Sequence, residues 1–323
     1  MNKNAKKFLK LYEEKREERS EKFGEIYPPM SWEEFHYWNN YTFEKHLQSF
    51  KNQAIKTKLY ISLLGRDVQY FAFWEAFSKA DFQVLNNAIW QESRTEILDR
   101  AITASGTTFT GFHLDAIFRS FATNDFEPLG AFFPAEIPLL TARYYPEVVA
   151  NILKSLLHKQ EENLQKSLQL AEKFLTKKLT GMERFTVLFF IALSEKNAEK
   201  ISENLHELCL AYQKQGYPVE KIDKCFAGEI HGLYRLVRFF DENLFEKVKM
   251  PQHDSFFTDF EAWQKQNGYP KGSFFYEYPP EMAYMNAILL KKLPIYHIFP
   301  QKSGAKIEFL PDKERFLEEF VKG

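Results

Sequence analysis

Val148-Val-Ala-Asn-Ile-Leu-Lys-Ser-Leu-Leu157 carries apolar side chains at three- and four-residue spacing. A polar break follows at Lys159-Gln160, and Leu164-Gln-Lys-Ser-Leu-Gln-Leu-Ala-Glu-Lys-Phe-Leu175 then repeats the same spacing. This spacing places the apolar side chains of each run on one face of an α-helix. The stretch therefore predicts two antiparallel helices joined by a short turn.

The same arrangement recurs along the chain. Similar polar breaks stand between or after apolar helical runs at Lys79-Ala-Asp81, Thr123-Asn-Asp125, Lys196-Asn197 and Asp241-Glu242. From Asn124 to Gln160 and from Gln160 to Lys196 the spacing is 36 residues. That period is typical of helical-hairpin repeats, whose apolar faces are buried only when hairpins stack. We expect an all-α fold of stacked antiparallel helical hairpins, arranged as a TPR-like α-solenoid or as a bundle.

The two ends of the chain differ from this pattern. Residues 3–25 are mostly charged and predict an exposed helix with a narrow apolar edge. We expect this helix to form a separate segment, 1–26, that precedes a single helical-hairpin domain, 27–323. Ser31-Trp-Glu-Glu34 is a capping box that begins a helix expected over residues 32–64. From about residue 268 we expect a cap, with strands at 295–299 and 306–310, and a last helix capped by Asp312.

Composition and charge exclude several classes of protein. The 323 residues include 43 basic and 44 acidic side chains, and a net charge of −1 argues against a nucleic-acid partner. Two cysteines are too few for a disulfide framework. Neither an apolar window long enough to span a membrane nor a secretory signal is visible, so we expect no membrane partner and a cytoplasmic location.

Catalytic signatures are missing from the sequence. It contains no dinucleotide-binding glycine motif, phosphate-binding loop, nucleophile elbow or His-Glu-x-x-His motif, so we expect no catalytic residues and no cofactor. Two cysteines and two histidines have residue types that zinc accepts, but the cysteines lie in helical runs, so buried thiols and no metal are expected. These four residues are His206, Cys209, Cys225 and His231. Glu229, His231 and His253 would form an acid–base set only if the fold brought them together.

One proline-flanked segment has the composition of a protein-recognition loop. Tyrosine and acidic side chains stand beside Pro279-Pro280, where the chain cannot form a regular helix. Tyrosine is enriched where proteins contact partners. The expected partner-binding residues are Tyr276, Glu277, Tyr278 and Glu281. The alternative is the start of a helix, with proline and glutamate in its first turn.

From about Phe112 to Leu290 the chain resembles bacterial immunity proteins of polymorphic-toxin systems, in particular the immunity protein 49 family. The resemblance lies in the succession of helices and short turns, over residues 118–125, 144–153, 190–197 and 205–212. It implies an all-α cytoplasmic protein that binds and neutralises a cognate protein toxin, with no catalytic residues to transfer. It leaves open the role of the segment before about residue 112.

Three functions follow from these observations. The first is an antitoxin that acts by protein–protein interaction and is not an enzyme. The second is a helical scaffold or regulator that binds a host peptide or protein. The third is an enzyme with a dispersed site, which requires a deep pocket with several convergent titratable groups. The sequence predicts neither the identity of the toxin nor the oligomeric state.

Overall fold

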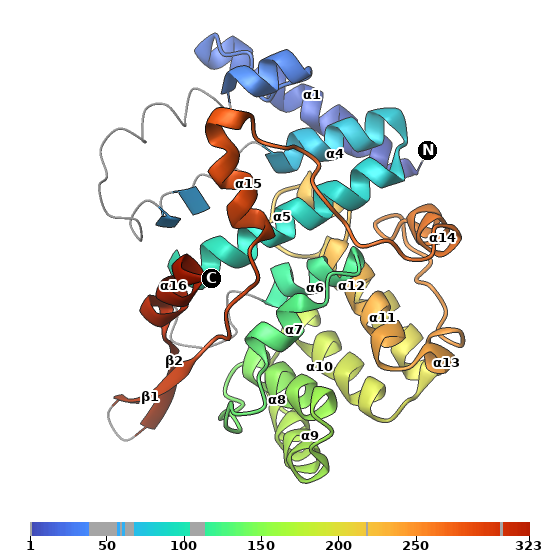
Figure 1. The fold of residues 1–323 in the computed structure, drawn as a ribbon. Coiled ribbons are helices and arrows are strands. Elements are labelled where there is room, and N and C mark those ends of the chain that lie inside the picture. The colour runs from blue at the N-terminus through green and yellow to red at the C-terminus, as the bar shows by residue number, and fades with distance from the viewer. Residues whose placement is uncertain are drawn as a thin grey trace.

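The structure is a computed structural model that describes residues 2–38, 57–58, 60–61, 68–103, 114–217, 219–303 and 306–323. It is all-α with one small β-hairpin near the C-terminus (Figure 1), which confirms the expected fold class. The elements discussed below are α1 (Lys3–Phe23), α4 (Val68–Lys79), α5 (Phe82–Thr103), α6 (Leu114–Ala122), α7 (Glu127–Phe132), α8 (Tyr145–Leu157), α9 (Glu161–Leu175), α10 (Gly181–Ser194), α11 (Ala198–Gln213), η1 (Asp223–Cys225), α12 (Gly228–Phe240), α13 (Glu242–Phe245), α14 (Thr258–Gln266), η2 (Pro280–Met282), α15 (Ala283–Leu290), β1 (Ile298–Ser303), β2 (Lys306–Pro311) and α16 (Lys313–Lys322).

Four of the five predicted breaks share one backbone geometry. Ala80, Asn124, Lys159 and Lys196 are left-handed, with φ between 52° and 58°. In each turn the left-handed residue donates its N–H to the carbonyl three residues back, and the next residue donates to the carbonyl five residues before it. This is the Schellman ending of a helix, which satisfies the last free carbonyls and reverses the chain. The fifth break differs, because Asp241 is extended and its carboxylate caps α13.

The charged helix α1 has the narrow apolar edge that the sequence predicts. Ala5, Phe8 and Tyr12 are buried on that edge, while most of the other side chains are exposed or half-buried. Phe8 packs edge-on against Phe73 and Phe77 of α4, with ring centroids 6.1 and 5.1 Å apart. The next expected helix, 32–64, is helical at residues 32–38, and most of its remainder lies outside the described residues.

Helices α6 and α12 cross at very short distance although they are far apart in the sequence. A Cβ atom on Gly232 would lie 1.6 Å from the carbonyl oxygen of Phe118, so only glycine permits this crossing. Repeats in an open solenoid contact only their neighbours. The crossing therefore favours the bundle over the solenoid, the two architectures that the sequence left open.

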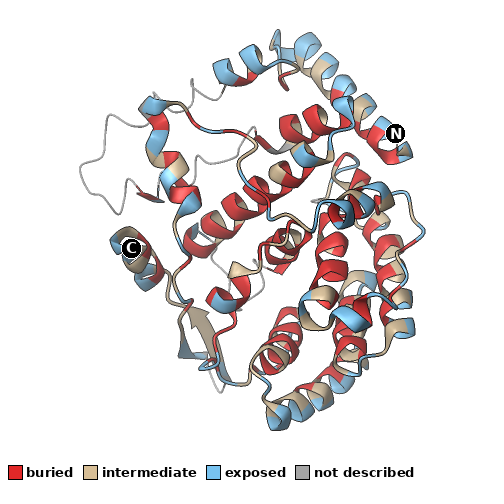
Figure 2. Ribbon diagram, turned by 45° about the vertical axis from the view of Figure 1, so that its right-hand side comes forward, coloured by how far each residue is buried: buried red, intermediate tan, exposed pale blue. Residues whose placement is uncertain are grey.

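Helix α5 runs through the middle of this bundle (Figure 1) and is buried along most of its length (Figure 2). It contacts α4, α6, α15 and α16. Five consecutive polar residues, Gln91 to Thr95, are buried on it. These five side chains therefore face protein or cavities, whereas Gln83 and Thr103 near the two ends of α5 are exposed.

The C-terminal elements form as expected, with a shift at the first strand. β1 and β2 pair antiparallel from Ile298–Pro311 to Ser303–Lys306, and Asp312 accepts the Arg315 N–H at the start of α16. The first strand begins three residues later than predicted, because Tyr296 is buried and donates its N–H to the Ala131 carbonyl of α7.

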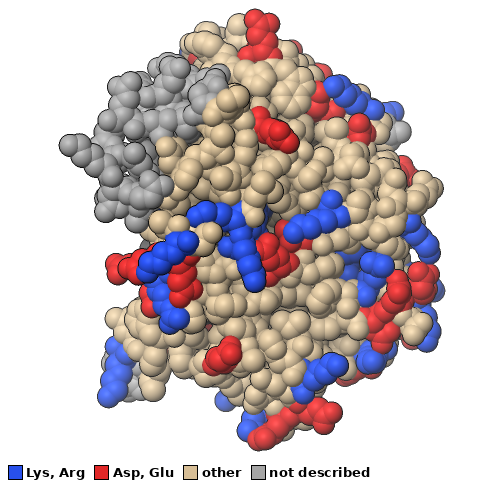
Figure 3. Space-filling view, in the orientation of Figure 1, with Lys and Arg blue, Asp and Glu red and all other residues tan. Residues whose placement is uncertain are grey.

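Charges on the molecular surface are mixed. On the face shown in Figure 3, basic and acidic side chains are interspersed and form no large area of one sign. Among the described helices, none has both the length and the apolar character needed to cross a membrane.

Candidate functional site

A cavity of about 720 Å³ lies between α5, α6, α12 and the α11–η1 connection. This volume is within the range of small-molecule sites in proteins. Its polar lining comprises six carboxyl and two guanidinium side chains, together with tyrosine and threonine hydroxyls. The charged members are Glu92, Glu96, Asp99, Arg100, Asp115, Arg119, Asp223 and Glu229.

One face of α5 supplies most of this lining. Glu92, Thr95, Glu96, Asp99 and Arg100 follow the spacing of three and four residues that aligns side chains along a helix. The opposite face of α5 is held by other contacts. Arg94 donates its Nε–H to the carbonyl of Leu289, which fixes the rotation of the helix. The polar face is therefore directed to the cavity by packing behind it.

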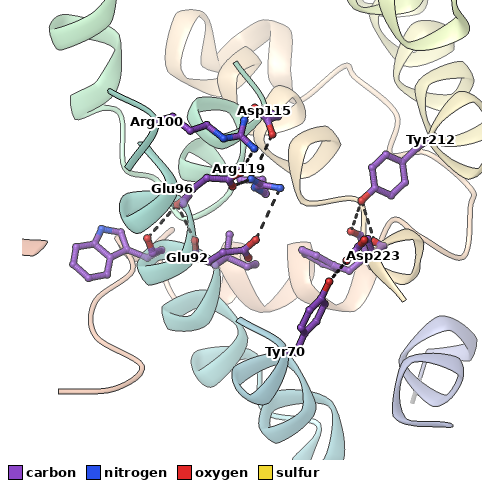
Figure 4. Close-up of polar contacts among 12 residues, drawn as sticks. Tyr70, Glu92, Glu96, Arg100, Asp115, Arg119, Tyr212 and Asp223 are labelled. Atoms are coloured by element: carbon purple, nitrogen blue, oxygen red, sulfur yellow. Dashed lines mark hydrogen bonds and ion pairs between the residues drawn. The ribbon is translucent and has the colours of Figure 1, made fainter. Parts of the chain in front are cut away.

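Two arginines and two acids form a closed ring at one side of the cavity (Figure 4). Glu96 accepts hydrogen bonds from both Arg100 and Arg119, and Asp115 pairs with the same two arginines. The Asp115 Oδ2 atom lies 3.6 Å from Nη2 of Arg119. Charge-assisted bonds of this kind orient guanidinium groups strongly. Both arginines are thus already neutralised by protein carboxylates.

Tyrosines and an aspartate line the other side. The Tyr70 hydroxyl donates to Oδ1 of Asp223 at 2.8 Å, and Oδ2 of Asp223 accepts the Glu220 N–H at 2.8 Å. The Tyr212 hydroxyl donates to the main-chain carbonyl of Asp223 at 3.0 Å (Figure 4). Burial raises the pKa of both tyrosine hydroxyls above the ordinary value, so they stay protonated donors. These bonds fix the η1 turn against α4 and α11.

Several polar groups in the lining lack close partners, including Nε of Arg119, which is buried and has no hydrogen-bond partner among the described residues. Glu92 is 8% exposed, its Oε2 has no hydrogen-bond partner among the described residues, and its Oε1 is 3.9 Å from the nearest guanidinium nitrogen, of Arg119. Thr95, also 8% exposed, has an unpaired hydroxyl within the same part of the chain. No hydrogen bond or ion pair joins the carboxyl of Glu229 to a described residue. A buried polar group without a partner costs stability and calls for an explanation.

The carboxyl groups of Glu92 and Glu229 have perturbed acidities. Burial raises the pKa of Glu229 to about 7, and the nearby charge of Asp115 acts in the same direction. Burial also raises the pKa of Glu92, although Arg119 opposes the shift. Perturbed carboxyl groups in a cavity are characteristic of functional sites. This cavity is therefore the candidate site of the protein.

Glu229, His231 and His253 are not brought together as an acid–base set. His231 is fully buried and is not among the residues that line the cavity. Its Nε2 accepts the Phe257 N–H at 3.0 Å, so its Nδ1 carries the proton that it donates to Glu261 at 2.7 Å. Burial lowers the pKa of His231. His253 lies elsewhere, next to Lys3 and Asp254 of another hollow. His231 is a satisfied core histidine, as the sequence suggests, and only Glu229 of the three reaches the cavity.

The cysteines are buried thiols. Cys209 and Cys225 are both free and fully buried, and burial raises their pKa values to about 12 and about 11. A metal ligand must be the thiolate, which such environments disfavour. Within the described ranges, no group of three or more histidine, cysteine or acidic side chains has the arrangement to hold a metal ion.

The proposed recognition loop is placed differently from the expectation. Tyr276 and Tyr278 are 3% and 4% exposed, so these tyrosines are not available to a partner, which corrects the sequence-based assignment. The amide of Gln91 on α5 binds the loop, accepting the N–H groups of residues 275 and 276 and donating to the carbonyl of Tyr276. Glu277 is exposed, and the side chain of Glu281 lies outside the described residues. The two tyrosines are therefore core residues of a loop that Gln91 fastens to α5 at residues 275 and 276 and Asn286 fastens to α15 at Tyr278.

Apart from Glu229, the residues of the cavity were not predicted from the sequence. A faint signal existed, because the acids and arginine at positions 92, 96 and 100 are aligned on one helix face inside a run with apolar neighbours at 89, 97 and 98. An exposed helix produces the same pattern. Only the packing of α6 against α5, together with the lining residues that α12 adds, shows that this face lines a cavity.

Comparisons of the chain with models of protein families, with curated protein sequences and with solved structures found no match.

Proposed function

We propose that this chain is a binding protein whose ligand site is the cavity between α5, α6 and α12. One observation carries the proposal: a cavity of about 720 Å³ contains the buried carboxyl of Glu92, whose Oε2 has no hydrogen-bond partner among the described residues and whose Oε1 has only a 3.9 Å ion pair with Arg119. Folding would bury such a group without a partner only at a cost. A ligand that pairs with it removes that cost, and the fixed ring of Arg100, Glu96, Arg119 and Asp115 keeps the site preformed.

The test is a comparison of ligand-induced thermal stabilisation in the wild type and in two variants of Thr95. Thr95→Phe places an aromatic ring in the cavity, and Thr95→Val keeps its volume. The probes are spermidine, citrate, adenosine monophosphate and maltose, with circular dichroism to verify folding. We expect at least one probe to raise the Tm of the wild type and of Thr95→Val but not that of Thr95→Phe. If no probe distinguishes Thr95→Phe from Thr95→Val, the cavity is not a small-ligand site.

As a second proposal, the partner that uses this cavity is a protein toxin, and the chain is its antitoxin. The support is the resemblance to immunity proteins, together with partial exposure of lining residues at the ring, where Glu96, Arg100 and Asp115 keep 25 to 31% of their side-chain surface exposed. A side chain of a protein partner can therefore reach the cavity. Docking of a protein there predicts that Glu96 and Asp115 become protected on complex formation.

Co-expression with the product of the adjacent gene tests this second proposal. We expect a stoichiometric complex, and rescue of cells from the toxicity of that product by the wild-type chain. Thr95→Phe should reduce the rescue while Thr95→Val retains it. Equal rescue by both variants would separate the antitoxin role from the cavity, and absence of any complex would refute the antitoxin role.

A further inference from the structure

The walls of the cavity are of two kinds. Besides the carboxyl groups, seven apolar side chains line it: Phe8, Val68, Phe73, Ile89, Val219, Ile222 and Phe226. Six carboxyl groups face only two guanidinium groups within the described lining, and both guanidinium groups are held by Glu96 and Asp115. The remaining lining is thus acidic and apolar at once. A ligand that fits both walls carries positive charge on an aliphatic chain.

We propose that the cavity binds an aliphatic cation, with ammonium or guanidinium nitrogen on Glu92 and Glu229 and methylene groups against the apolar wall. The inference rests on the proposed binding function of the cavity. The group that points most directly to a ligand is Glu92, because its Oε2 is buried and has no partner among the described residues. The unpaired hydroxyl of Thr95, one helical turn away, adds an acceptor for a second N–H.

The electrostatics select against other ligand classes. A bound anion would face the carboxyl groups of Glu92 and Glu229. The charges of Arg100 and Arg119 are already balanced by Glu96 and Asp115, although Nε of Arg119 has no hydrogen-bond partner among the described residues. A neutral ligand can form hydrogen bonds with these carboxyl groups, but it supplies no counter-charge to their ionised forms. A cation supplies the missing counter-charge. Its source is either a free polyamine or the lysine or arginine side chain of a protein.

Binding of a cation should displace protons. The titratable and charged groups that influence Glu92 and Glu229 come from every wall: Arg100 on α5, Asp115 and Arg119 on α6, Tyr145 on α8, Tyr212 on α11, Asp223 in η1 and Tyr70 on α4. None of these supplies a free cation next to Glu92 or Glu229. The entering positive charge therefore favours ionisation of both carboxyl groups, and affinity should rise with pH through neutrality.

Isothermal titration calorimetry tests the inference with three probes: spermidine, the capped peptide acetyl-Gly-Lys-Gly-amide, and citrate. The proteins are the wild type, Glu92→Gln, Glu229→Gln and, as a matched control, Glu172→Gln on the exposed side of α9. Loss of one charged hydrogen bond should weaken binding about 10- to 100-fold. We expect this loss in the two cavity variants and unchanged affinity in Glu172→Gln. Both cavity variants remove a poorly solvated charge, so they should remain folded.

The outcomes separate the inference from the proposed function. Binding of spermidine identifies a free polyamine as the source, and binding of the peptide alone identifies a protein side chain. If citrate binds and Thr95→Phe abolishes that binding, the cavity remains a ligand site but the cation inference is overturned. Equal binding of a cation to all four proteins, or no binding of either cation, also overturns it.

Discussion

Replacing Glu229 by glutamine should stabilise the protein at alkaline pH and have little effect at acid pH. Burial raises the pKa of this carboxyl from 4.5 to about 7. At about 1.4 kcal/mol per tenfold change in acidity, the anion is destabilised by about 3 kcal/mol. Because water reaches part of this side chain, we expect Glu229→Gln to raise the free energy of unfolding by about 2–3 kcal/mol.

The sign follows from proton linkage. Between pH 4.5 and 7 the folded state holds the Glu229 proton more tightly than the unfolded state does, so stability falls as pH rises through this window. Above about pH 7 the folded protein is destabilised by the full amount, because Glu229 is ionised in both states. Below pH 4.5 this destabilisation disappears, because Glu229 is protonated in both states. Glutamine is neutral throughout and has nearly the same shape. The gain from Glu229→Gln is therefore full at pH 8 and below about 1 kcal/mol at pH 4.5.

Urea denaturation at pH 4.5 and pH 8 measures this difference, with Glu172→Gln as the control for removal of an exposed carboxylate. The control should change the free energy of unfolding by less than about 0.5 kcal/mol at both pH values. A gain from Glu229→Gln that is the same at both pH values, or a loss at pH 8, would refute the assignment of Glu229 as a poorly solvated, unpaired acid.

Three further experiments test the helix crossing, a left-handed turn and the loop anchor of this fold. Gly232→Ala should lower the free energy of unfolding by about 3 kcal/mol or more, because the added Cβ meets the backbone of α6. Gly130→Ala in α7 has free space around the added Cβ and should raise the free energy of unfolding by up to about 1 kcal/mol. Urea denaturation of both variants measures the two changes. Lys159→Gly should raise the Tm and increase the free energy of unfolding by about 0.5–1 kcal/mol, because φ of residue 159 is 52°. Lys178→Gly should not raise the Tm. An equal effect of the two substitutions would contradict the role of the left-handed turn. Gln91→Leu should cost about 2–4 kcal/mol and accelerate amide hydrogen exchange at residues 275 and 276, because it removes their shared acceptor; unchanged exchange would disprove the anchoring of this loop.

The sequence predicted the helical hairpins well because their determinants are local. The apolar spacing in α8 and α9 and the polar break at Lys159 are properties of consecutive residues, and four breaks of this kind form the same turn. The Asp312 cap is equally local. By contrast, the crossing of α6 and α12 depends on a contact between Gly232 and Phe118, which are far apart in the chain. No period in the sequence indicates that contact.

The candidate site was not predictable for the same reason. Glu92, Glu96 and Arg100 on α5 match an exposed, ion-paired helix face until α6 and α12 are placed over them. Composition also gave a wrong prediction of exposure for Tyr276 and Tyr278. Tyrosine beside proline is common at interfaces, but it can equally be a core residue when its backbone is held, as Gln91 holds that of Tyr276. Burial of a polar side chain depends on distant elements and is therefore the hardest property to infer from one sequence.

Proton release on binding of spermidine is the most direct test of the cavity as a cation site. Calorimetric titration at pH 7 in two buffers of different ionisation enthalpy gives the number of protons exchanged. With the pKa of Glu229 near 7, pairing with a cation should release about half a proton from this group, plus a contribution from Glu92. The release should fall in Glu229→Gln. Binding without proton release, or with proton uptake, would contradict the account.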